Sequence, residues 1–106
     1  MLITTTETVA NHRVVKTLGL VRGNTVRARH VGKDIMASLR NLVGGEIHEY
    51  AKLIAESREQ TLDRMVAEAE SLGANAVIAT RFTTSVMMGG AAELLAVGTA
   101  VVIEPE

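Results

Sequence analysis

Apolar residues recur every three or four positions through the middle of the chain, which is the pattern of amphipathic helices. The pattern predicts a short helix from Lys33 to Val43 and a long helix from Glu46 to Leu72. The stripe of the long helix comprises Ile47, Tyr50, Ile54, Arg58, Leu62, Met65, Ala69 and Leu72. Arg58 is the exception in this stripe, and Ser57 and Thr61 flank it. We therefore expect the middle of the long helix to face a polar junction instead of a dry core.

Outside the helices, apolar and β-branched residues occur in short runs that are typical of strands. We expect a short strand at Leu2–Thr4, a turn or loop at Thr5–Asn11, a β-hairpin at His12–His30, and strands at Asn75–Val86 and Glu93–Glu104. The hairpin turn is predicted at Arg22, Gly23 and Asn24, because glycine and asparagine tolerate the positive φ angles of tight turns.

Small residues mark two further positions with special backbone requirements. Gly73 follows the long helix and is expected to end it in the left-handed conformation. In the last strand, Ala96, Gly98 and Ala100 share one face. A face without large side chains lets another element come unusually close, so we expect such an approach here.

Two adjacent glycines, Gly44 and Gly45, separate the two predicted helices. Each costs about 1 kcal/mol of helix stability relative to alanine, so the pair predicts a sharp turn or a close backbone approach. Charged and aromatic residues lie on both sides of this break. The candidate ligand-binding or interface residues are Asp34, Arg40, Gly44, Gly45, Glu46, Tyr50 and Arg81.

Arg81 belongs to this set for a separate reason. Strand alternation places it on the same face as Val77, Ala79 and Thr83, where its guanidinium is expected to enter a partly buried environment. One interpretation is a structural ion pair across a subunit boundary, which suits a planar guanidinium. The other is a binding site for an anion or a carboxylate.

Composition narrows the functional classes. A chain of 106 residues is expected to form one domain, residues 1–106. Hydrophobic residues make up 47% of it, although Tyr50 and Phe82 are its only aromatic residues. Its positive mean hydropathy suggests that apolar surface is shared between subunits, so we expect a homo-oligomer. The net charge of −1 and the dispersed Lys and Arg residues argue against nucleic acid as a partner.

The absence of cysteine excludes disulfides and thiolate chemistry. The longest apolar run, Leu94–Ile103, is much shorter than the roughly 20 residues that a membrane-spanning helix needs. The first residues hold neither Lys nor Arg ahead of a long apolar core, so we expect no secretory signal. The expected compartment is therefore the cytoplasm, and no membrane partner is expected.

Three histidines lie on three different predicted elements. A metal site usually takes two ligands close together on one element. The nearest approach to this arrangement makes His30, Asp34 and His48 the candidate ligands for a divalent metal ion, with exposed polar surface as the competing interpretation. No arrangement of nucleophile, base and orienting group is visible, so an enzyme using Asp34 or a histidine as general base is the less favoured alternative.

Several strings spread along the whole chain resemble the YbjQ family, an uncharacterised family with a heavy-metal-binding label. They are TTTETV, LGLVRGNTV, DIMASLRNLVGGEIHEY, AEAESLGANAVIATRF and AVGTAVVIE. The resemblance implies an α+β subunit with an antiparallel or mixed sheet, two consecutive helices packed on it, and a ring-like homopentamer with a central barrel. Related dodecin-like subunits hold flavins by stacking on tryptophan, and this chain has no Trp, so flavin binding of that kind is not expected.

Three hypotheses about function follow. The first is a non-enzymatic cytoplasmic homopentamer that binds a small ligand or metal ion at subunit interfaces, lined by Asp34, Arg40, Glu46, Tyr50 and Arg81. The second is a structural module whose partner is another protein. Its contact would be the methionine-containing segment 87–92, because flexible methionine-rich surfaces suit adaptable binding. The third, an enzyme of unknown reaction, has the least support.

Overall fold

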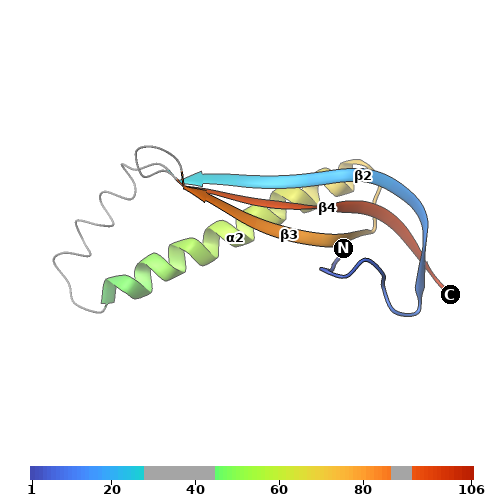
Figure 1. The fold of residues 1–106 in the computed structure, drawn as a ribbon, viewed down its shortest axis with the longest axis horizontal. Coiled ribbons are helices and arrows are strands. Elements are labelled where there is room, and N and C mark those ends of the chain that lie inside the picture. The colour runs from blue at the N-terminus through green and yellow to red at the C-terminus, as the bar shows by residue number, and fades with distance from the viewer. Residues whose placement is uncertain (28–44, 87–91) are drawn as a thin grey trace.

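The computed structural model describes residues 1–27, 45–86 and 92–106. Its elements are β1 (Leu2–Ile3), β2 (His12–Arg27), α2 (Gly45–Ser71), β3 (Ala76–Val86) and β4 (Ala92–Pro105). The strands form one sheet in the order β1-β3-β4-β2, with β1 parallel to β3 and the other neighbours antiparallel. α2 runs along one face of this sheet (Figure 1). The predicted α+β class and mixed sheet are confirmed, whereas the predicted helix at Lys33–Val43 lies outside the described residues.

The predicted hairpin at 12–30 is wrong, because β2 is one strand of 16 residues that stays paired with β4 from His12 to Arg27. The glycine that suggested a turn serves instead for close packing. A Cβ atom on Gly23 would overlap the Thr61 carbonyl oxygen and would lie 2.5 Å from the Met65 nitrogen. The backbone of α2 therefore lies directly against β2 at this residue.

The long helix is confirmed, since α2 spans Gly45–Ser71 against the predicted Glu46–Leu72. Gly73 ends it with a φ of +85°, as predicted. The Gly73 N–H donates to the Glu70 carbonyl at 3.0 Å, and the Ala74 N–H donates to the Ala69 carbonyl at 3.1 Å. These two bonds form a Schellman motif, which satisfies carbonyl groups that the helix end would otherwise leave without partners.

The buried side of α2 differs in part from the predicted stripe. Met65 and Ala69 are buried as expected, but Arg58 is exposed and Leu72 is 45% exposed. The buried line instead comprises Ser57, Thr61, Met65 and Ala69, one residue for every turn or so of the helix. Two of these four side chains are small and polar because the helix meets the backbone of β2 too closely there for larger ones.

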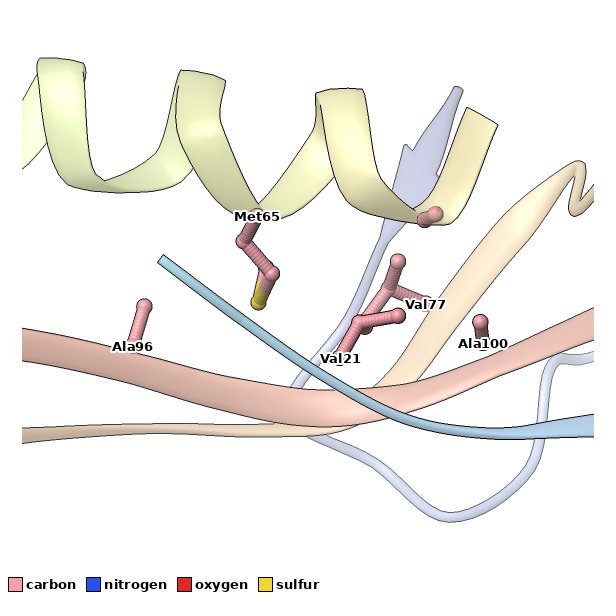
Figure 2. Close-up of a cluster of buried hydrophobic side chains, with 6 residues drawn as sticks. Val21, Met65, Val77, Ala96 and Ala100 are labelled. Atoms are coloured by element: carbon pink, nitrogen blue, oxygen red, sulfur yellow. The ribbon is translucent and has the colours of Figure 1, made fainter. Parts of the chain in front are cut away.

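The core lies between α2 and the sheet and consists of small and medium aliphatic side chains (Figure 2). Its buried members are Val21, Met65, Ala69, Val77, Ala96 and Ala100. The predicted close approach to the small-residue face of the last strand is confirmed, because Ala96, Gly98 and Ala100 are all buried beneath other elements. A Cβ atom on Gly98 would lie 2.5 Å from a methyl group of Val77, so β4 has no room for a larger residue there.

Within residues 1–27, 45–86 and 92–106, no helix is long and apolar enough to cross a bilayer.

Candidate functional site

Most candidate residues from the sequence lie where the structure describes no side chain. His30, Asp34, Arg40 and Gly44 fall outside the described residues. Gly45, Glu46, His48 and Tyr50 lie in the first turns of α2, and only their backbone is described. The segment 87–91, proposed as a protein contact, also falls outside. Arg81 is the one candidate whose side chain can be placed.

Arg81 lies on the opposite sheet face from Val77, which contradicts the predicted shared face. The pairing of β3 with β4 shifts between Ile78 and Arg81: three residues on β3 advance against two on β4. This irregularity is a β-bulge, centred on a positive φ of 54° at Ala79. The extra residue reverses the alternation, so Arg81 pairs with Val97 while Val77 pairs with Ala100 on the α2 side.

The Arg81 guanidinium binds backbone carbonyl groups. Its Nη1 donates to the Thr5 carbonyl at 2.7 Å and to the Thr80 carbonyl at 2.8 Å. The residue is exposed, contrary to the predicted partly buried environment. The same N-terminal segment is held to β3 by backbone bonds from Ala79 N–H to Thr6 and from Thr80 N–H to Thr4, at 2.8 and 3.0 Å. Arg81 thus ties this segment to the sheet.

The sheet face opposite α2 carries apolar residues at its surface. Directly paired residues share a face, and Val21, Gly23 and Thr25 are buried towards α2. We call the opposite side the uncovered face; its members are Leu20, Arg22, Asn24 and Val26 on β2, Glu93, Leu95, Val97 and Thr99 on β4, and Ile78, Arg81, Thr83 and Ser85 on β3. Leu20 is 68% exposed and Val26 is 49% exposed. No helix in the described part of the chain covers this face.

Two arginines lie in one row across the uncovered face. Arg22 and Arg81 both pair with Val97, from β2 on one side and β3 on the other. Adjacent strands are about 4.8 Å apart, so their Cα atoms are separated by roughly 10 Å. Asn24 donates to Glu93 at 3.2 Å on the same face. The face therefore combines apolar residues with two positive charges that flank Val97 and one carboxylate, Glu93, four residues away along β4.

The polar junction expected in the middle of the long helix is confirmed. The Thr25 and Thr61 hydroxyls lie 2.9 Å apart, and the Thr61 hydroxyl donates to the Ser57 carbonyl at 2.8 Å. All three residues are buried. The junction joins β2 to α2 through satisfied hydrogen bonds, which is a structural role.

A metal centre has no support within the described residues, where no three His, Asp or Glu side chains come together. An open hollow of about 440 Å³ lies along α2, lined by Ala55, Glu56, Glu59 and Gln60. The two carboxylates that line it, those of Glu56 and Glu59, do not indicate a particular class of ligand. The predicted ligands His30, Asp34 and His48 stay a prediction, since their side chains are not described.

Comparison with known proteins decides the family. A family model described as "Putative heavy-metal-binding" matches residues 1–104. The chain is a member of the YbjQ family. The resemblance in the sequence strings is thereby confirmed, because the match covers almost the whole chain.

Similar YbjQ-family proteins occur in bacteria and archaea, under the name UPF0145. One from Dehalococcoides mccartyi is 57% identical over 104 residues, which cover 98% of this chain and all of that protein. One from Archaeoglobus fulgidus is 60% identical, covering 95% of this chain and 94% of that protein. One from Clostridioides difficile is 57% identical over the whole of this chain and 95% of its own length. These names state no activity.

A solved structure shares the fold. It is a protein of unknown function of the DUF74 family from Pediococcus pentosaceus, which aligns over 98% of each chain with a TM-score of 0.65. The sequences are 16% identical, so the likeness extends to the fold alone.

Sequence reasoning missed the uncovered face, although its signal was present. Leu20, Arg22, Asn24 and Val26 alternate strictly with the buried residues between them. Interpreting Gly23 as a turn divided this alternation and hid its continuity. A strand of 16 residues would have predicted one buried and one exposed face.

Proposed function

We propose that this YbjQ-family protein is a non-enzymatic homo-oligomer in which another copy of the chain packs on the uncovered face. A small ligand or metal ion binds at the subunit interfaces. The ring-like homopentamer implied by the family is the assembly we favour. The cytoplasm is its expected compartment.

The observation that carries this proposal is the exposure of Leu20 and Val26 on the uncovered face. Fully burying an aliphatic side chain of this size contributes roughly 1.5–3 kcal/mol. The partly exposed residues Leu95 and Val97 extend the same surface across β4. A neighbouring subunit on this face accounts for the apolar surplus of the chain better than exposure to water does.

The charges on this face favour an anionic ligand over a metal cation. Arg22 and Arg81 place two permanent positive charges on either side of Val97. Guanidinium groups bind carboxylates and phosphates through paired hydrogen bonds, and partial burial at an interface strengthens these bonds. A small acid seated between subunits fits this arrangement, whereas the metal alternative depends on His30, Asp34 and His48.

Native mass spectrometry of untagged protein, purified without chelators, tests the proposal. We expect a pentamer that retains a discrete extra mass. A bare pentamer would contradict the ligand, and a monomer at micromolar concentration would contradict the assembly. Thermal melting with divalent metals and with carboxylate or phosphate anions then separates the two ligand classes, because a ligand that binds the folded state raises the melting temperature.

A further inference from the structure

The long strand β2 has an outer edge that faces away from β4. In the part of the chain that the structure describes, β2 is the last strand of the sheet. Its 16 residues compare with about 5–6 in a typical strand. An open strand edge presents N–H and C=O groups that pair readily with another strand, so native proteins protect such edges. An edge of this length needs protection along its whole extent.

Two side chains of α2 occupy this edge. The Glu68 carboxylate accepts a hydrogen bond from the Arg22 N–H at 3.1 Å. Arg64 Nη1 donates to the Asn24 carbonyl oxygen. Both backbone groups of a strand residue point to the same side, and residues two apart point alike. Arg22 and Asn24 therefore present their backbone groups on one edge. The two side chains of α2 form a hydrogen bond with one backbone group of each residue.

The distance between Arg64 and Glu68 along the helix matches the distance between Arg22 and Asn24 along the strand. Arg64 and Glu68 are four residues apart on a helix, which is about 6 Å along its axis. Arg22 and Asn24 are two residues apart on a strand, about 6.6 Å. Gly23 lies between them, at the position where the backbone of α2 contacts β2. The close approach at Gly23 thus brings both side chains within reach of the edge.

The first half of the edge is protected in another way. The pairing of β2 with β4 is irregular between Val14 and Lys16 and again between Thr17 and Gly19. Bulges of this kind twist an edge and interrupt its regular row of backbone groups. The regular stretch around Arg22 and Asn24 lacks such a bulge, and that stretch is where Arg64 and Glu68 reach over.

We propose that Arg64 and Glu68 form an edge guard that prevents a strand from a second copy of this chain from pairing with β2. Both contacts are exposed, so they contribute little to folding stability. Their effect is to occupy the backbone groups that an incoming strand needs. This inference does not depend on the proposed function, because the guard acts at the sheet edge and the proposed assembly uses the uncovered face.

The double variant R64A/E68A tests the guard by sedimentation velocity over a range of protein concentrations. We expect species larger than those of the wild type, whose share rises several-fold as concentration increases. The matched control is R58A/E59A, which also removes one positive and one negative exposed side chain from α2. The control is expected to sediment like the wild type. A wild-type distribution for R64A/E68A would overturn the proposal.

A third substitution separates edge pairing from partial unfolding. R22P removes the N–H that Glu68 occupies, and proline is tolerated on edge strands where this group faces outward. Adding R22P to R64A/E68A is expected to return the size distribution to that of R22P alone. Large species that persist in the triple variant would contradict pairing at this edge.

Amide hydrogen exchange gives a readout that does not require assembly. Glu68→Gln keeps a side-chain oxygen that can accept from the Arg22 N–H, whereas Glu68→Ala has none. We expect the Arg22 amide to exchange at least about ten-fold faster in E68A than in the wild type, and E68Q to stay near the wild type. Equal exchange in all three proteins would show that Glu68 does not occupy the edge.

Discussion

The packing of α2 depends most closely on Gly23, where the helix backbone leaves no space for a side chain. The Thr61 carbonyl and the Met65 nitrogen both lie within the volume of a Cβ atom at this position. The same contact aligns the Thr25–Thr61 hydrogen bond and the two edge-guard bonds. The lack of a side chain at Gly23 therefore sets the distance between α2 and β2.

Gly23→Ala is expected to destabilise the fold by about 3 kcal/mol, because neither backbone atom can move without shifting the helix. Chemical denaturation measures the change in the free energy of unfolding. Arg58→Ala, at an exposed position of α2, is the control and is expected to change stability by less than about 0.5 kcal/mol. A loss below about 1 kcal/mol for Gly23→Ala would contradict the close approach.

Thr80 carries a buried side-chain hydroxyl. Its side chain is 3% exposed, and within the described part of the chain its hydroxyl has no hydrogen-bond partner. An unsatisfied buried hydroxyl costs about 1–3 kcal/mol. Thr80→Val is therefore expected to stabilise the protein by about 1 kcal/mol in denaturant titrations.

Thr25→Val is the matched control for Thr80→Val. The Thr25 hydroxyl is buried and bonded to Thr61, so its removal is expected to destabilise by about 1 kcal/mol. Two chemically identical substitutions should thus move stability in opposite directions. A loss of stability for both would show that Thr80 has a partner that the geometry does not reveal.

At the scale of the elements, a helix or strand could be predicted when the residues that determine it are close together in the sequence. The ends of α2 were predictable because the apolar period and the glycine after it are local features. The continuity of β2 was not, since Gly23 suits a turn by itself and suits close packing only when α2 is present. The bulge at Ala79 was equally hidden, and it moved Arg81 to the other face. Contacts between elements far apart in the sequence determine the conformation at both Gly23 and Ala79.

Gly73→Ala tests the helix end. Alanine is strained at a φ of +85°, so a loss of about 1 kcal/mol is expected. Asparagine tolerates this conformation better, so Gly73→Asn should lose less. Thermal melting of the two variants beside the wild type gives the order. Equal stability of all three would contradict the Schellman motif as the end of α2.

At the scale of the whole molecule, α2 fills one face of the sheet, and no helix of residues 1–27, 45–86 and 92–106 lies on the other. The family was predictable from strings along the whole chain, and the comparison confirms it. The site was not predictable in the same way. Apart from Arg81, its candidates rested on the double-glycine region, while the exposed surface that the structure reveals lies on the sheet. The alternation along β2 was present in the sequence, but which residues of β3 and β4 share that face depends on the register of three strands, which no local pattern contains.

The most direct test of the account is the subunit count of Leu20→Glu by native mass spectrometry. A carboxylate at the most exposed apolar position of the uncovered face should disfavour a neighbouring subunit by its desolvation cost. Leu72→Glu, at the exposed residue that follows α2, is the control and should assemble like the wild type. We predict oligomers for the wild type and the control, and monomers for Leu20→Glu. An unchanged oligomer in Leu20→Glu would contradict assembly through the uncovered face.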